Sequence, residues 1–252
     1  MAVLSPTVVG NIYNVVVDFS DVNAWRDHLP MINGTADQVD FNDNFRTNAL
    51  MCFYDYTAAS QTVAEVRLTL MSFDTSGLSD VESATLSMYG HTNSATGDPT
   101  GHSTDGIVVV GLSSAMNATD SLSTSDWGDL ANGVSQPPLL SDNLTSWNVG
   151  TSTANVFTFN STALNLINTT DTFQIAICHK FWYDFSATAQ PFTFGNAPDG
   201  SNGFGVLTGA YYGMGDDDTY KPFMTTTGPS GLSFKINSGA KVQVSSGKFL
   251  ID

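Results

Sequence analysis

The segment from Arg67 to Gly90 constrains the fold of this chain more than any other stretch. Apolar and polar residues alternate on both sides of a turn, with apolar residues at Leu68, Leu70, Ala84, Leu86 and Met88. A period of two residues is typical of a strand with one buried face. The turn between them, Asp74 to Gly77, consists of Asp, Thr, Ser and Gly, which favour corners. The segment therefore predicts two half-buried strands joined at a corner.

The composition favours an all-β protein. Glu65 and Glu82 are the only glutamates among 24 acidic residues, and Lys and Arg together number 8, so residues that build surface helices are scarce. Ser, Thr, Asn and Gly fill short intervals between apolar runs, as they do in sandwiches and barrels. At 252 residues the chain can bury a core without metals or disulfides, and one large β domain is favoured over two small ones.

Strands are predicted at residues 49–56, 63–73, 83–89, 107–112, 155–159, 172–178, 191–194, 204–207 and 221–226. A short helix is predicted at Asp21 to His28, because Asp is a favoured N-cap and Pro30 stops a helix. A single helical turn is predicted within residues 160–168. Residues 90–106 and 120–151 are predicted as long loops, which in compact β domains are often functional.

The two ends of the chain differ from the predicted body, residues 45–227. Residues 1–44 are predicted as an N-terminal arm and loop, whose valine runs form either an edge strand or a segment that docks on a neighbour. Residues 228–252 alternate apolar with polar residues after a Gly-Pro-Ser-Gly break, which predicts a small hairpin. This C-terminal β arm holds three of the eight basic residues. It either folds on its own domain or adds strands to a neighbouring subunit.

The charge restricts the partners. The formal net charge is −16, and nucleic acids and anionic membranes are bound through Lys and Arg clusters, so neither is a predicted partner. The first residues lack a basic region before an apolar core, and no 18-residue apolar run occurs. Neither a Sec-type signal nor a membrane span is therefore predicted. Cys52 and Cys178 have apolar or aromatic neighbours and are predicted as buried thiols.

No catalytic residue is predicted, and the chain is expected not to be an enzyme. The histidines stand in no catalytic signature, and no G-x-S-x-G elbow occurs. His91 and His102 share one loop, where either a metal or solvent surrounds them, and zinc needs three or four ligands. Glycoside hydrolysis needs two carboxylates in opposed environments, and the sequence marks no such pair.

No cofactor is predicted, and calcium is the one candidate ion. Asp216, Asp217 and Asp218 follow the flexible Gly213 to Gly215, and a second Asp-rich and Asn-rich group lies at residues 37–44. Carboxylate oxygens suit a hard cation, although neither group matches an EF-hand loop. The alternative is that these are ordinary turns whose carboxylates bond their own backbone.

Six aromatic residues are candidates for stacking on a sugar ring, for an interface or for the core: Trp127, Trp147, Trp182, Tyr183, Tyr211 and Tyr212. Adjacent residues of a strand point to opposite faces, so at least one of Phe181 to Tyr183 is expected to point outward. Aromatic residues are enriched both in cores and in interfaces, so all three roles stay open.

The segment FDTSGLSDVESATLSMYG, Phe73 to Gly90, resembles the strand, corner and strand of DNRLRE-type domains, the disaggregatase-related carbohydrate-binding modules. Trp127 and residues 156–168, 173–178 and 220–226 are similar to later segments of the family in the same order. Asn160 stands where the family has Asp, and the hexapeptide that names the family does not occur. The resemblance implies a jelly-roll β-sandwich and sugar binding.

The sequence thus predicts an all-β, jelly-roll β-sandwich with long loops and a C-terminal hairpin. One functional hypothesis is a virion structural protein, a capsid decoration, spike or fibre component of a tailed bacteriophage. It rests on the acidic, Ser-rich, Thr-rich and Asn-rich composition and on the arms at both ends. Its expected partners are copies of itself, other virion proteins such as the major capsid protein, and a surface glycan. The alternative is a carbohydrate-binding module or an adhesin domain.

Overall fold

A computed structural model of the chain describes residues 1–17, 38–41, 47–51, 54–58, 61–94, 106–112, 137–180, 183, 204–205, 208–212, 220–228, 242–245 and 248–251. Side chains are described in residues 1–12, 68–90, 106–112, 137–178, 180, 183 and 220–228. The statements below concern these residues.

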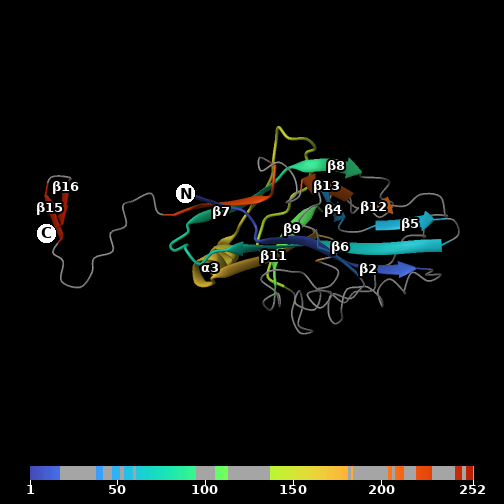
Figure 1. Cartoon of the computed structure of the whole chain (residues 1–252), viewed down its shortest axis with the longest axis horizontal. Helices are drawn as coiled ribbons and strands as arrows, with labels where there is room; N and C mark the ends of the chain where they lie inside the picture. The colour runs from blue at the N-terminus through green and yellow to red at the C-terminus, as the bar shows by residue number, and fades with distance from the viewer. Residues whose placement is uncertain are drawn as a thin grey trace.

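Two antiparallel sheets form a β-sandwich, as the sequence predicts (Figure 1). The first sheet has four strands in the order β1 (Ala2–Leu4), β14 (Phe223–Thr227), β7 (Ser83–Met88) and β10 (Asn155–Thr158). The second has seven, comprising β12 (Phe204–Gly205), β5 (Tyr54–Ala58), β6 (Gln61–Asp74), β11 (Thr172–His179), β9 (Ile107–Gly111), β2 (Val8–Val17) and β3 (Gln38–Phe41). The long strand β6 pairs with β2, β5 and β11 and so organises this sheet.

Three smaller pieces complete the described structure. Strands β4 (Thr47–Met51), β13 (Thr208–Tyr212) and β8 (Gly90–Ser94) form a three-stranded sheet. Strands β15 (Val242–Ser245) and β16 (Lys248–Ile251) form a two-stranded hairpin, which Figure 1 shows apart from the sandwich. The helix α3 (Ser161–Thr169) connects β10 of the first sheet to β11 of the second.

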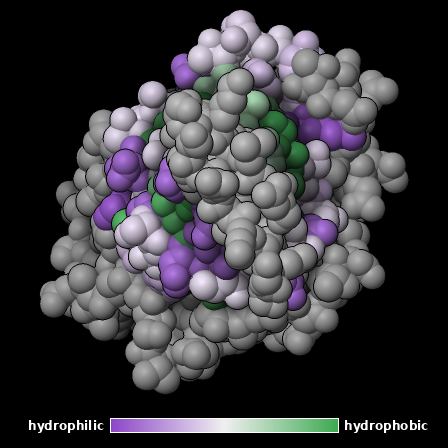
Figure 2. Space-filling model, turned by 90° about the vertical axis from the view of Figure 1, so that its left-hand side faces the viewer, coloured by the Kyte–Doolittle hydropathy of each residue, from purple (hydrophilic) through white to green (hydrophobic). Residues whose placement is uncertain are grey.

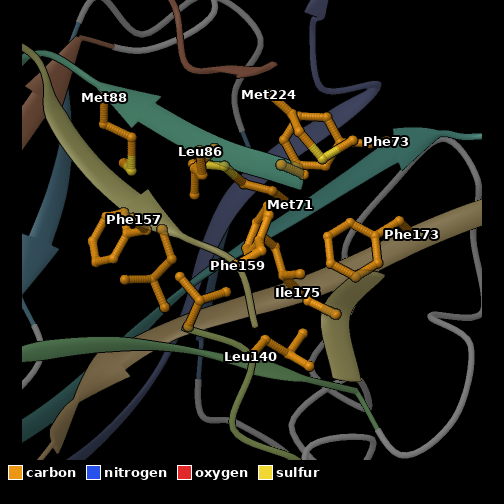
Figure 3. Packing of buried hydrophobic residues seen from close by; sticks show 14 of the residues in the cluster. Met71, Phe73, Leu86, Met88, Leu140, Phe157, Phe159, Phe173, Ile175 and Met224 are labelled. Carbon is orange, nitrogen blue, oxygen red and sulfur yellow. The ribbon is translucent and has the colours of Figure 1, made fainter. Parts of the chain in front are cut away.

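The core lies between the two sheets. Leu86, Met224 and Phe157 stand opposite one another on the four-stranded sheet, and each is no more than 1% exposed. They face Met71 and Ile175, which are paired on the seven-stranded sheet and 0% exposed (Figure 3). Full burial of each such side chain stabilises the fold by roughly 1.5–3 kcal/mol relative to exposure.

The seven-stranded sheet is buried on both faces where β6, β9 and β11 meet. Leu70 and Ala176 are paired and point away from the side that carries Met71 and Ile175, yet both are 0% exposed. The continuous apolar run Ile107 to Val110 is typical of a strand with two buried faces.

Helix α3 covers one end of this core. Asn160 is its N-cap and accepts a hydrogen bond from the Ala163 amide at 3.1 Å. Ala163 and Ile167 are buried, and Phe159 and Phe173 on either side of the helix meet edge to face at 5.4 Å. The predicted helical turn is therefore confirmed, although the helix is longer than one turn.

Residues 137–150 close one side of the sandwich. Ile107 of β9 and Leu144 bond each other's backbone, at 2.9 and 2.8 Å. The Leu140 amide donates to the Val109 carbonyl, and the Leu140 carbonyl accepts from the Asn160 amide. The segment, predicted as part of a long loop, is thus hydrogen-bonded both to the seven-stranded sheet and to the end of β10.

Six further strand predictions are confirmed, and three others differ from the structure. Those at 63–73, 83–89, 107–112, 155–159, 172–178 and 221–226 are confirmed as β6, β7, β9, β10, β11 and β14, and Cys178 is buried. The predicted strand at 49–56 is instead two strands, β4 and β5, in different sheets. Residues 90–94, predicted as loop, form β8, because its polar sequence pairs with β13 through the backbone. Of the predicted strand at 204–207, residues 204–205 form β12, and β13 begins at Thr208.

Cys52, the predicted helix at 21–28 and the predicted strand at 191–194 lie outside the described residues. Two strands from the predicted N-terminal arm, β1 and β2, are hydrogen-bonded into the two sheets of the sandwich. The predicted C-terminal hairpin is formed by β15 and β16.

Candidate functional site

The outer face of the four-stranded sheet carries the candidate site. Leu86 and its neighbours on alternate positions of β7 point into the core, so Thr85 and Ser87 point outward. Besides the exposed pair Ser83 and Thr227 at one end of the sheet, the register places the outward residues in two rows. The first has Val3, Thr225, Thr85 and Thr158, and the second has Phe223, Ser87 and Val156. These seven residues are called the hydroxyl face here, and all seven side chains are uncharged.

Methyl groups and hydroxyl groups share this face. Val3 is 59% exposed and Val156 45% exposed, one on each edge strand of the sheet. Phe223 and Val156 stand on either side of Ser87, which is only 6% exposed. Such a surface offers apolar contact together with hydroxyl hydrogen bonds, without the desolvation cost of a charge.

An aromatic pair lies at one end of the hydroxyl face. Tyr89 follows β7, and its ring meets that of Tyr220 edge to face at 5.5 Å and 82°. Phe223 begins β14 three residues after Tyr220, and all three side chains are half-buried. The edge-to-face contact fixes the orientation of both rings, so the pair presents apolar ring surfaces that end in polar hydroxyl groups. Sugars and protein surfaces are the two partner classes that such rings suit.

The opposite end of the sandwich, where β6 turns towards β7, is acidic. Four carboxylates are exposed there and are called the acidic end: Asp74, Asp80, Glu82 and Asp171. The amide of Glu82 donates to the carbonyl of Thr227 at 2.8 Å, and the amide of Thr75 donates to the carbonyl of Asp171 at 2.9 Å. These bonds bring together segments that are far apart in the sequence.

Asn168, near the end of α3, is hydrogen-bonded to the same corner. Its side-chain oxygen accepts from the Val81 amide at 2.7 Å, and its side-chain nitrogen donates to the Val81 carbonyl at 3.0 Å. The hydroxyl of Ser76 donates to Asp74 at 2.7 Å, and the amide of Ser76 donates to the same oxygen. These two bonds, the hydroxyl first, lower the pKa of Asp74, because both favour its charged form.

Two of the six predicted aromatic residues lie inside the fold. Trp147 is 5% exposed and belongs to the core. Tyr183 is 9% exposed, and its hydroxyl donates to the Pro137 carbonyl at 3.1 Å while Lys180 Nζ lies 5.9 Å from its ring centroid. Neither ring leaves much surface for a ligand.

The remaining predicted site residues are placed only in part. Tyr211 and Tyr212 lie in β13, opposite Asn48 and Thr47, and Asp40 lies in β3 opposite Asn11. The residues that lie outside the described part of the chain are Trp127, Trp182, Asp216, Asp217 and Asp218. Of the Asp-rich and Asn-rich group at 37–44, only residues 38–41 are described. The roles predicted for these residues stay predictions.

Sequence reasoning did not single out the Tyr89 and Tyr220 pair. Alternation along β7 does mark Tyr89 as outward, but its partner precedes β14, and only the register between β7 and β14 brings the two together. A tyrosine at an outward position next to the end of an alternating strand was the available signal.

A scan against family models matched none, and a search of curated proteins found no match. In the described part of the chain, no three His, Cys, Asp or Glu side chains are grouped to hold a metal ion. No helix among the same residues is long and apolar enough to cross a bilayer.

Proposed function

We propose that this chain is a non-enzymatic virion structural protein, a capsid decoration, spike or fibre component of a tailed bacteriophage. It works in the virion, beside copies of itself and other virion proteins such as the major capsid protein. The hairpin β15–β16 carries the proposal, because its strands pair with each other and with no third strand among the described residues. A lone two-stranded hairpin is marginally stable in water, which favours a role in contact with another subunit.

Two further features support an assembly role. The hydroxyl face is uncharged and carries exposed valines on both edge strands, so it suits contact with another protein surface. The net charge of −16 keeps separate chains soluble before they assemble.

Sedimentation velocity over a wide concentration range tests this proposal. The full chain is expected to form a closed multimer of its 26.8 kDa subunit, and a chain ending at Gly228 is expected to be monomeric. Circular dichroism of the shortened chain serves as the control for folding. A full chain that stays monomeric at every concentration contradicts the proposal.

A carbohydrate-binding module or adhesin is the second candidate, and the aromatic pair beside the hydroxyl face favours it. Sugar rings stack on exposed aromatic faces, and hydroxyl side chains bond sugar hydroxyls. A glycan array probed with the full chain, with Tyr220→Ala and with Asn165→Ala on the exposed side of α3 tests this function. Binding that Tyr220→Ala abolishes and Asn165→Ala retains supports it, and no binding by the full chain contradicts it.

Calcium binding at Asp216 to Asp218 remains a proposal beside either function. Isothermal titration of calcium into the full chain and into the triple Asp→Asn variant tests it. Equal heats for the two proteins at millimolar calcium contradict it.

A further inference from the structure

Among the described strands, β1 is an edge strand with one open side, at the acidic end of the sandwich. It pairs with β14 through Ala2 to Leu4, and no strand among the described residues pairs with its other side. An edge strand leaves a row of backbone N–H and C=O groups available to a further strand. The side chain of Val3 is 59% exposed, so it leaves approach to this edge open.

The C-terminal tail leaves the sandwich beside this edge. Thr226 of β14 stands opposite Ala2, and the chain passes from there to Gly228 next to the carbonyl of Asp80. Figure 1 shows the hairpin beyond the sandwich, on the side where the N-terminus also lies. The 14 residue steps from Gly228 to Val242 span at most about 50 Å when extended, enough to reach a neighbouring sandwich.

The charges of the tail and of the acidic end are complementary. The tail carries Lys235, Lys241 and Lys248 against a single acidic residue, Asp252. The acidic end carries four exposed carboxylates, of which Glu82 and Asp80 lie next to the end of β14, at Thr227 and Gly228. Figure 2 looks onto this side of the molecule and shows hydrophilic residues beside hydrophobic ones there. Charges of opposite sign on two surfaces steer their association and fix its orientation.

We propose that the open edge of β1 accepts the C-terminal hairpin of a second copy of this chain. The inference deepens the proposed function and rests on it, since it names the partner and the contact through which the chain assembles. Within one chain the tail leaves the sandwich beside β1, and among the described strands the hairpin does not pair with β1. Edge and hairpin are therefore both available to a neighbour, and addition of the hairpin places it on a wider sheet.

Each copy has one edge and one hairpin, so the contact gives a reciprocal dimer, a ring, or a filament where the rotation between copies does not close. Mixing two defective chains separates donor from acceptor. A chain ending at Gly228 keeps the edge and lacks the hairpin, whereas Val3→Lys keeps the hairpin and places a charge on the edge that repels the basic tail. Each variant is expected to be monomeric alone. Val3→Lys impairs only the edge of the chain that carries it, so the mixture is expected to form a complex with one copy of each variant.

Val149→Lys is the matched control. Val149 is an exposed valine, 52% exposed, outside the hydroxyl face in the segment that closes one side of the sandwich. Val3→Lys is expected to weaken self-association by about tenfold or more, and Val149→Lys to leave it unchanged. Light scattering gives the association constant, and circular dichroism checks the fold of each variant.

Charge exchange provides an independent test that does not depend on Val3. Glu82→Lys with Asp171→Lys is expected to weaken association about tenfold, and adding Lys235→Glu with Lys241→Glu is expected to restore it. Asp142→Lys, an exposed aspartate beside β9, serves as the control and is expected to have no effect.

The outcomes separate the inference from the proposed function. If the full chain assembles and neither Val3→Lys nor the charge exchange differs from its control, the β1 edge is not the acceptor, and the proposed function stands. If the chain ending at Gly228 assembles as the full chain does, the hairpin is not the donor. If the full chain is monomeric throughout, both the inference and the assembly function fail.

Discussion

At the scale of single residues, Asn160 joins α3 to the segment that closes the sandwich. Its side-chain oxygen caps α3 through the Ala163 amide, and its side-chain nitrogen donates to the Leu139 carbonyl at 2.7 Å. Asn160→Ala removes both bonds and is expected to lower the free energy of unfolding by about 1–2 kcal/mol. Urea unfolding measures the change, with the exposed helical Asn165→Ala as control. Equal stability of the two variants contradicts this role.

Gly90 is a position where no side chain fits. A Cβ there would lie 2.1 Å from the Asn148 carbonyl oxygen and 2.6 Å from the Trp147 indole nitrogen. Gly90→Ala is expected to destabilise the fold by about 1–3 kcal/mol, because the backbone and a buried ring must move. Gly77→Ala, which meets nothing within 4 Å, is the control. Thermal unfolding compares the two, and a Gly90→Ala protein as stable as Gly77→Ala contradicts the packing described.

Asp74 links stability to pH. Its pKa is lowered from the ordinary value of 3.8 by the Ser76 hydroxyl and then the Ser76 amide. A lowered pKa stabilises the fold above the unfolded pKa, and that stabilisation is lost as the pH falls through the folded value. Asp74→Ala is therefore expected to be less stable than the unaltered chain at neutral pH, and the difference is expected to shrink below pH 3.8. Urea midpoints at several pH values measure it, and a difference independent of pH contradicts it.

At the scale of elements, the hairpin β15–β16 is separable from the sandwich. It pairs only with itself among the described strands, so its removal takes no ladder bonds from either sheet. A chain ending at Gly228 is expected to keep the melting temperature that the unassembled full chain has. Differential scanning calorimetry at low protein concentration measures this. A fall of about 4 °C or more would mean that the tail stabilises its own sandwich.

The alternation of polar and apolar residues in the sequence predicts those strands whose two faces differ in polarity. Strands β7, β10 and β14 each have one face in the core and one outside, and the sequence places all three closely. The polar strand β8 has no such pattern, since it is specified by backbone pairing with β13. The division of residues 47–58 between two sheets depends equally on distant partners.

The sequence predicts single outward residues of the candidate site, but not which residues lie beside them. The outward position of Thr85, Ser87 and Tyr89 follows from alternation alone. Their neighbours Phe223 and Val156 follow from cross-strand register, which a single sequence does not specify between distant strands. Trp147 illustrates the converse, because its place in a predicted loop gave no sign that residues 137–150 are bonded to both sheets.

At the scale of the whole molecule, the β1 edge, the acidic end and the hairpin β15–β16 lie on one side (Figure 1). In the proposed assembly, these three features are parts of one contact between copies of the chain. Amide hydrogen exchange at residues 2–5 tests it most directly, in the full chain and in the chain ending at Gly228. Exchange at these residues is expected to be slower by about tenfold or more in the assembled full chain, since a hydrogen-bonded amide exchanges only when its bond opens. Equal exchange rates in the two chains, with the full chain assembled, would contradict it.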